Sequence, residues 1–194
     1  MLLYCKKDLI KVNKIVKQKE FMKMYEEIHT SFIRYCKAKS YGILDYKDLV
    51  NETILRAFES FDKIKNKKSF PAYLFNISSN IIKNELRKKN RETNKSFIIN
   101  QDLYVENKSI QKFEIELLYK ALSKLPEEQK EAIILFEISG YSIKEITKIQ
   151  DSSISAIKQR LKRGRDKLAI ILNIPKIEKE KLNGKSKILI SLFL

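Results

Sequence analysis

The sequence predicts an all-α protein built from two small helical domains joined by a flexible linker. Only 4 glycines and 3 prolines occur among the 194 residues, where average usage would give roughly 13 and 10. Apolar residues recur at helical spacing in several segments, and this periodicity fades from about Asn90 to Lys112. We therefore expect domains at 1–92 and 113–172, a linker at 93–112, and an extension at 173–194 to which the sequence assigns no role.

Three helices are expected in the first domain. They run from about Phe21 to Lys37, from about Asp45 to Phe61 and from Phe70 to about Lys89. Gly42 separates the first two, and Pro71 stands in the first turn of the third, where its missing N–H is not needed. The residues expected on the core side of these helices are Met24, Ile28, Phe32 and Tyr35, then Val50, Ile54, Ala57, Phe58 and Phe61, then Phe70, Leu74, Ile77 and Ile81.

The second domain has the punctuation of a helix-turn-helix. One helix opens after Pro126 and closes at Gly140. Ser142 and Glu145 then have the spacing of a capping box, which predicts a short helix at about Ile143–Ile149. A turn at Gln150–Ser152 and a long helix at about Ser153–Leu172 complete the motif, and the stripe expected to pack inward on the long helix is Ile154, Ile157, Leu161, Leu168 and Leu172.

The charge of the chain indicates what it binds. Subtracting 24 acidic from 40 basic side chains leaves a net charge of +16, which favours a polyanionic partner such as nucleic acid or an anionic membrane. A disordered basic tail is the alternative. With 43% hydrophobic and 10% aromatic residues, the chain is too apolar for such a tail, and we expect a folded basic protein.

Several functional classes find no support in the sequence. There is no phosphate-cradling loop, zinc-protease helix or nucleophile elbow, and His29 is the single histidine. Cys5 and Cys36 form neither a disulfide framework nor a metal motif. Lysines interrupt the apolar residues at the N-terminus, and the apolar stretch Ile188–Leu194 is too short to span a bilayer. We expect a soluble, cytoplasmic, non-enzymatic protein that uses no cofactor and does not insert into the membrane.

The long helix of the second domain is expected to read duplex DNA. Opposite its apolar stripe it carries small residues and hydrogen-bond donors suited to major-groove edges and phosphates. A solvated polar face is the alternative, but the capped helix and turn that precede it are the scaffold that a recognition helix needs. The residues of this expected duplex-binding surface are Ser155, Ala156, Lys158, Gln159, Arg160, Lys162 and Arg163.

The third helix of the first domain is expected to bind single-stranded nucleic acid. Asparagines spaced four residues apart are poor helix formers, yet their amides can bond exposed base edges beside a stacking Tyr and a basic loop. An AT-rich genome, which enriches Asn and Lys everywhere, is the alternative explanation. This expected strand-binding surface comprises Lys63, Lys65, Lys67, Lys68, Tyr73, Asn76, Asn80, Lys83, Asn84 and Arg87.

The second helix contrasts with the overall charge. Asp45, Asp48, Glu52 and Glu59 line one side, and Leu49 and Leu55 are expected to lean outward among them. Carboxylates around exposed leucines are suited to a basic helix of a protein partner. A plain solvated face is the alternative.

These segments resemble the bacterial sigma-70 family, in the extracytoplasmic-function (ECF) class that retains only regions 2 and 4. DYKDLVNETILRAFESF at Asp45–Phe61 is similar to region 2.2, and SFPAYLFNISSNIIKNELRKKNR at Ser69–Arg91 is similar to regions 2.3 and 2.4. The stretch Leu125–Leu168 resembles region 4, including KQRLKRGR at Lys158–Arg165. Four positions depart from the family pattern, because Tyr73 replaces a Trp, Asn84 an Asp, Asp151 a Gly and Ser152 an aliphatic residue.

The resemblance implies a role for each surface. Asp45, Asp48, Leu49, Glu52 and Leu55 would dock on the β′ clamp helices of core RNA polymerase, and the β flap and an anti-sigma factor are further implied partners. The strand-binding surface would melt and hold the −10 element of promoter DNA, and the second domain would read the −35 element as duplex. A sigma factor makes no bonds itself, so the resemblance implies promoter choice and strand opening.

The linker length agrees with two separate contacts on one DNA molecule. About 20 extended residues reach roughly 66 Å, against roughly 70 Å for two turns of B-DNA. Three other classes stay open at this point. A helix-turn-helix regulator that does not bind core polymerase lacks a use for the acidic helix, an RNA-binding protein accounts only for the charge, and a membrane-surface protein has no basic amphipathic helix left without a better explanation.

Overall fold

The computed structural model describes residues 2–64, 66–93 and 110–173, and these ranges are helical without any strand. The all-α prediction is therefore confirmed for the described part of the chain. The elements are α1 (Leu2–Ser40), α2 (Tyr46–Glu59), two short 3₁₀ turns (Phe61–Lys63 and Lys67–Ser69), α3 (Phe70–Thr93), α4 (Ile110–Ser123), α5 (Glu127–Ile133), a π-helical turn (Ile134–Ile138), α6 (Ile143–Ile149) and α7 (Ile154–Ile171).

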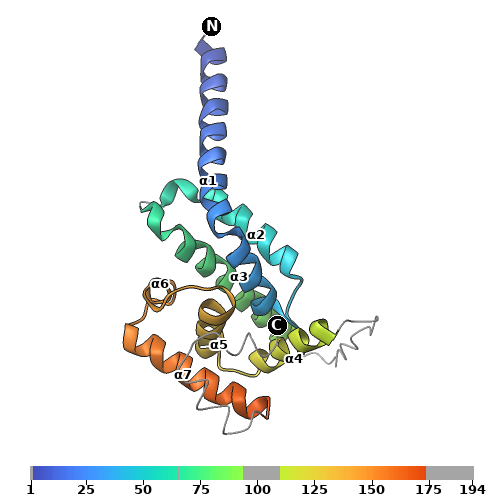
Figure 1. Ribbon diagram of the computed structural model, residues 1–194. Coiled ribbons are helices and arrows are strands. Elements are labelled where there is room, and N and C mark those ends of the chain that lie inside the picture. The colour runs from blue at the N-terminus through green and yellow to red at the C-terminus, as the bar shows by residue number, and fades with distance from the viewer. Residues whose placement is uncertain (1, 65, 94–109, 174–194) are drawn as a thin grey trace.

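The first helix is longer than the sequence pattern predicts. It starts at Leu2 instead of Phe21, and its N-terminal turns extend away from the body of the molecule (Figure 1). The residues before Phe21 contain no Gly or Pro, so the helix continues there without an apolar face to reveal it. The predicted linker falls mainly on residues 94–109, which lie outside the described residues, and the domain boundaries stay a prediction.

Helices α1, α2 and α3 pack around an aromatic core. The Phe21 ring meets the rings of Phe58, Phe61 and Phe70 edge-on, with centroids 5.3–5.4 Å apart. Further along α1, Tyr35 meets the ring of Phe75 at 4.6 Å. Most of the predicted core positions are buried, whereas the predicted stripe of α3 missed two fully buried residues, Phe75 and Ile82.

Helices α1, α2 and α3 form the first unit of the molecule, and the helices from α4 to α7 form the second unit. The second unit has the predicted helix-turn-helix. Helix α6 has the predicted bounds, and its capping box is complete: the Ser142 amide donates to Glu145 Oε2 at 2.8 Å, and the Glu145 amide donates to Ser142 Oγ at 3.3 Å. A Cβ atom added to Gly164 of α7 would lie 2.9 Å from Ile133 Cγ1. The close packing of α7 on α5 therefore depends on this glycine.

One predicted core residue of α7 is wrong. Ile154 is 47% exposed, although Ile157, Leu161 and Leu168 are buried as predicted. The helix begins at Ile154 with Ser153 as its N-cap, so no preceding helical turn covers this side chain.

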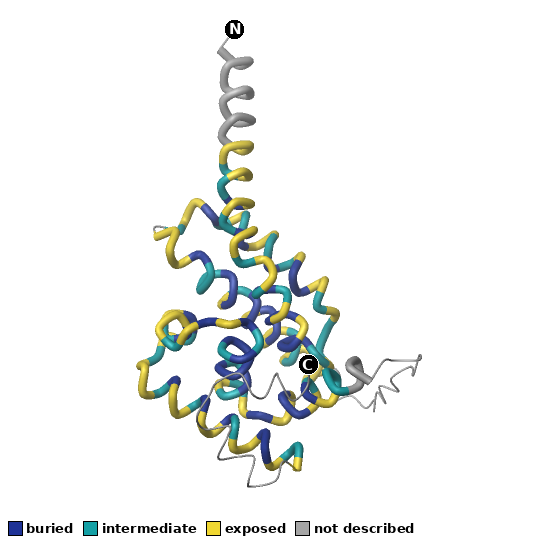
Figure 2. Tube along the Cα trace, viewed as in Figure 1, coloured by how far each residue is buried: buried dark blue, intermediate teal, exposed yellow. Residues whose placement is uncertain are grey.

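The two units pack directly against each other. Helix α1 contacts the π-helical turn, and α3 contacts α6. Tyr141 lies at this interface, where its ring meets the Phe75 ring at 5.1 Å and its hydroxyl lies 3.1 Å from the Ser31 hydroxyl. Buried residues continue through both units (Figure 2). No helix within the described ranges is both long and apolar enough to cross a membrane.

Candidate functional site

The predicted strand-binding residues of α3 divide between two hollows. Asn76, Asn80 and Lys83 are exposed and line a pocket of about 230 Å³. The opposite side of this pocket belongs to the second unit, with Glu128, Glu131, Gln150, Asp151 and Arg160. This part of the predicted strand-binding surface thus faces the second unit of the same chain.

Asn84 and Arg87 lie in the second hollow, at the C-terminal end of α3. This pocket of about 310 Å³ is lined mainly by basic side chains, namely Arg56, Arg87, Lys88 and Arg91. The helical wheel places all three asparagines on one face of α3. The second unit packs beside Asn76 and Asn80, whereas Asn84 lies away from that interface.

The other predicted strand-binding residues surround the start of α3. Lys63 and Lys68 are exposed, Lys67 pairs with Glu20 of α1, and Lys65 lies outside the described residues. Tyr73 is half-buried against the core, and its hydroxyl contacts the Ser60 hydroxyl. Its ring is therefore only partly available for stacking on a base.

A buried polar network joins the two units at Glu131 of α5. Glu131 Oε1 accepts hydrogen bonds from the Tyr35 hydroxyl at 2.8 Å and from Lys39 Nζ at 3.1 Å, and it also accepts one from the Ser79 hydroxyl. Burial alone would raise the pKa of Glu131, but the Lys39 charge and these hydrogen bonds outweigh it and lower the pKa below its usual 4.5. The carboxylate is therefore held in its charged form.

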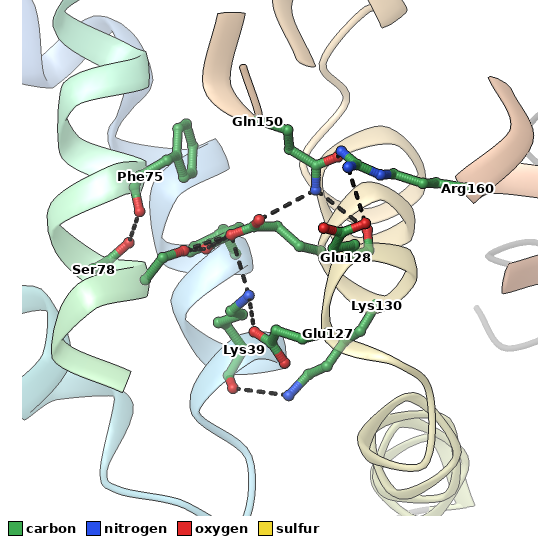
Figure 3. A network of polar contacts seen from close by, with 11 residues as sticks. Lys39, Phe75, Ser78, Glu127, Glu128, Lys130, Gln150 and Arg160 are labelled. Atoms are coloured by element: carbon green, nitrogen blue, oxygen red, sulfur yellow. Dashed lines mark hydrogen bonds and ion pairs between the residues drawn. The ribbon is translucent and has the colours of Figure 1, made fainter. Parts of the chain in front are cut away.

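Lysine side chains extend this network (Figure 3). Lys39 also pairs with Glu127 of α5, and Lys130 Nζ donates to the Lys39 carbonyl at 3.3 Å. Burial lowers the pKa of Lys130. The sequence analysis missed the whole network, because charged residues inside KAKS and EEQKEA have no pattern that separates them from surface charges. The one available signal is that Lys39 follows Tyr35 by four residues, on the same face of α1.

Helix α7 presents the predicted duplex-binding surface to solvent. Ser155, Lys158, Gln159, Lys162 and Arg163 are exposed and Ala156 is half-buried. The helix packs on α5 and α6 through its opposite side. Unlike the Asn face of α3, the five exposed residues of this surface line neither of the two hollows.

Arg160 differs from the rest of that surface, because its guanidinium is engaged by other described residues of the protein. Its Nη1 donates to Gln150 Oε1 at 2.9 Å and to Ser152 Oγ at 2.8 Å, and its Nη2 pairs with Glu128 Oε2 at 2.9 Å. Asp151, between these partners, adopts a left-handed φ of 45°. The resemblance predicts a looser turn without Gly at this position, but Asp tolerates the left-handed region, and Arg160 ties the flanking residues to α7.

The acidic surface of α2 is exposed except at Glu52, which is half-buried, and at Leu49. Asp45 caps the helix by accepting from the Lys47 amide, Asp48 is exposed, and Glu52 accepts from Arg56 Nε at 2.6 Å. Leu55 is 54% exposed, as predicted, but Leu49 is fully buried. The prediction that Leu49 leans outward is wrong, because its side chain shares the core face of α2 with Thr53 and Ala57, at spacings of four residues.

The described residues contain no group of three or more side chains that could hold a metal ion. His29 is exposed, with its ring edge-on to Tyr25 at 5.2 Å. The described surfaces carry hydrogen-bond donors on α3 and α7 and carboxylates on α2.

Two family models match this chain. The family model for sigma-70 region 2 matches residues 24–92, which hold α2 and α3, and the model for sigma-70 region 4 matches residues 115–168, which hold the helix-turn-helix. Together the two models match more than half of the chain, in the order that the sequence motifs predict.

Individual relatives agree with this assignment. The chain is 34% identical over 132 residues to the ECF RNA polymerase sigma factor EcfG of Rhodopseudomonas palustris, covering 66% of this chain and 71% of that one. It is 27% identical over 135 residues to the ECF RNA polymerase sigma-E factor of Haemophilus influenzae, covering 63% and 71%.

Two solved structures share the fold. One is the sigma factor RpoE in complex with the anti-sigma factor NepR from Bartonella quintana, with a TM-score of 0.66 and 26% identity over 81% of this chain and 99% of that chain. The other is CnrH in complex with the cytosolic domain of CnrY, with a TM-score of 0.60, 24% identity and coverage of 80% and 89%. The chain therefore belongs to the sigma-70 family, as an ECF RNA polymerase sigma factor that initiates transcription and is itself not an enzyme.

Proposed function

We propose that this sigma factor divides promoter recognition among three surfaces, with α7 on the −35 duplex, α3 on the melted −10 strand and α2 on core RNA polymerase. The single observation that carries the proposal is the exposed polar face of α7. This helix follows the capped helix α6 and a turn that Arg160 holds by hydrogen bonds. A helix of this kind enters the major groove with its N-terminal residues on base edges.

The −35 surface consists of Ser155, Ala156, Lys158, Gln159, Lys162 and Arg163. Arg160 has a different part, since its guanidinium holds the turn before α7. Exposed lysines supply contacts to phosphates. Arg163 offers the paired donors that read a guanine edge, and Gln159 offers the donor and acceptor that read an adenine edge. Duplex binding by this surface leaves the contact between the two units intact.

The −10 surface is the face of α3 from Asn76 to Arg87, continued by Lys63 and Lys68. Asn amides suit the exposed edges of unpaired bases, and the lysines suit the backbone of a single strand. A pocket of about 230 Å³ is smaller than the roughly 300–1,000 Å³ of ordinary ligand sites. Asn76 and Asn80 are exposed, but a strand of several nucleotides does not fit between them and the second unit, so full contact with this face follows once the second unit has moved.

The polymerase-docking surface is formed by Asp45, Asp48, Glu52 and Leu55 on α2. Because Leu49 is buried, Leu55 is the apolar contact of this surface. The variant Asp48→Arg with Leu55→Ala is expected to lose capture by core polymerase while keeping its affinity for duplex DNA. A matched control is Glu27→Arg with Leu117→Ala, which makes the same changes at other exposed positions. Equal capture of both variants would contradict the docking role.

Further partners follow from the relatives. The anti-sigma factor NepR binds the sigma factor RpoE in a solved structure that this chain resembles. We assign an anti-sigma factor to this chain as well, with the β flap of polymerase as the partner of the second unit. The place of action is the cytoplasm, where polymerase and promoter DNA are. Transcription in vitro by core polymerase from a genomic promoter library tests the whole proposal, because a chain without sigma activity yields no promoter-specific transcripts.

A further inference from the structure

Three hydrogen-bond donors of the first unit converge on one carboxylate of the second unit. Tyr35 and Lys39 come from α1, and Ser79 comes from α3. All three bond the same oxygen, Glu131 Oε1. The Tyr35 and Ser79 hydroxyl oxygens lie 2.9 Å apart, and because each hydroxyl has one proton, they do not bond each other while both donate to Glu131. The other oxygen, Oε2, accepts from Gln150 Nε2 at 3.2 Å, within the second unit.

Lys39 makes this cluster a site for an anion. Its side chain is 1% exposed, and both carboxylates that neutralise it, Glu127 and Glu131, come from α5. A buried ammonium without a counter-ion is strongly destabilising. If α5 moves away, Lys39 loses both partners while the Tyr35 and Ser79 hydroxyls stay beside it. The first unit then holds three convergent donors that lack an acceptor.

The cluster lies next to the proposed −10 surface. Ser79 and Glu131 both line the pocket that Asn76, Asn80 and Lys83 line. A single strand whose bases meet these Asn amides carries its backbone along the same face of α3. Phosphate and carboxylate oxygens are both anionic acceptors, and both form charge-assisted hydrogen bonds with ammonium and hydroxyl donors.

We propose that Tyr35, Lys39 and Ser79 form a binding site for one backbone phosphate of the melted promoter strand, and that Glu131 occupies this site until the second unit moves away. The proposal rests on the proposed −10 role of α3 and adds a phosphate contact to it. It also makes strand binding and contact between the two units mutually exclusive, because they use the same three donors.

The first experiment measures opening of the full-length chain without DNA. Spin labels are placed at Lys47 of α2 and Lys167 of α7, both exposed, in a Cys5→Ser background. Cys36 is buried and burial raises the pKa of its thiol, so it does not take up label. The variant Glu127→Gln with Glu131→Gln is expected to lengthen the distance between the labels, because Lys39 then has no counter-ion.

The matched control is Glu26→Gln with Asp166→Asn. It changes the net charge by the same amount, and both residues are exposed, Glu26 on α1 and Asp166 on α7. The control is expected to keep the wild-type distance. An unchanged distance in the Glu127→Gln/Glu131→Gln variant would overturn the claim that Glu131 holds the site.

The second experiment measures affinity for an oligothymidylate of about twelve nucleotides, within the range of strand lengths that such surfaces bind. A phosphate contact is independent of sequence, so this probe suffices. The Glu127→Gln/Glu131→Gln variant is expected to bind about tenfold more tightly than its control or better, since apparent affinity scales with the open fraction. Adding Lys39→Met to that variant is expected to remove the gain and to lower the salt slope by about 0.7.

Lys37→Met in the same background is the control for Lys39→Met. Lys37 is exposed on α1 and lies over the Tyr46 ring, away from the cluster. Equal affinity and equal salt slope for the two variants would overturn the phosphate site. A failure of the proposed −10 role has a different signature: Asn80→Ala would then leave oligothymidylate binding and promoter opening unchanged, whereas the distance between the labels would still respond to Glu127→Gln/Glu131→Gln.

Discussion

The Asn face of α3 and the polar face of α7 have the same kind of composition but opposite surroundings. Asn76 and Asn80 line a small pocket whose opposite wall contains the carboxylates of Glu128, Glu131 and Asp151. The donors of α7, in contrast, are exposed to solvent. One surface is thus matched to carboxylates of its own chain and the other is free for DNA. With the proposed roles, this difference means that duplex reading needs no movement of the two units, whereas strand binding requires their separation.

The largest change to this comparison is expected from Glu131→Arg. It places a cation beside Lys39 in a buried site, and breaking a buried pair costs about 3–5 kcal/mol. Because Glu131 lies outside the −35 surface, the variant should gain affinity for single strands and keep its affinity for duplex DNA. Binding titrations with an oligothymidylate and with a promoter duplex check both expectations. If the variant gained duplex affinity to the same extent, the two surfaces would not be controlled separately.

A second variant affects helix α7, which carries the duplex-binding surface. Gly164→Val fills the space between α7 and Ile133, where even a Cβ atom lies 2.9 Å from Ile133 Cγ1. Overpacking of this kind costs about 1–3 kcal/mol. Thermal unfolding should show this loss, and duplex affinity should fall because α7 is displaced. Asp166→Ala, at an exposed position of the same helix, is the control, and equal stability of the two variants would show that Gly164 is not needed for packing.

Lys162→Ala and Arg163→Ala distinguish phosphate contacts from base contacts on the exposed face of α7. A lysine on one phosphate is expected to lower affinity for every sequence and to reduce the salt slope by about 0.9, whereas an arginine paired with a guanine costs about 1–3 kcal/mol at one base pair only. Duplex titrations over a series of salt concentrations, with consensus and singly substituted duplexes, measure both effects. If neither variant alters affinity or slope, α7 is not the recognition helix.

Acidic pH is expected to separate the second unit from the Asn face of α3, with a smaller effect than the substitutions above. The pKa of Glu131 lies below its usual 4.5, so its carboxylate stabilises the contact above that pH, and this stabilisation is lost as the pH falls through the lowered pKa. The pKa of Glu137, beside Arg165 in the second unit, is raised by burial, so its protonation favours the folded unit. The label distance should therefore increase in acid before the helix content falls. Simultaneous loss of both would contradict this order.

Local signals in the sequence account for the parts of the site that were predicted well. The capping box of Ser142 and Glu145 fixes α6 to the residue, because it depends on side chains three positions apart. Leu49 and Ile154 were misplaced for the opposite reason. Whether a residue at the edge of an apolar stripe is buried depends on the neighbouring helix, and neither the packing of α2 on α1 and α3 nor the start of α7 can be derived from a helical wheel.

The network around Glu131 shows where such prediction ends. Lys39 and Glu131 are 92 residues apart, and the residues between them include the linker. Each is an ordinary charged residue in its own helix, and only the contact between the two units makes both of them buried partners. The exposed polar face of α7 and the exposed carboxylates of α2 could therefore be predicted from local patterns, whereas the packing of the second unit against the Asn face of α3 could not.

The central claim is that the free sigma factor keeps its −10 surface against its own second unit and releases it during promoter binding. Pulsed electron spin resonance on the wild-type chain labelled at Lys47 and Lys167 tests this most directly. We predict a single narrow distance in the free chain and a longer one after addition of core polymerase and promoter DNA. A broad distribution in the free chain, or the same distance in both states, would contradict the claim.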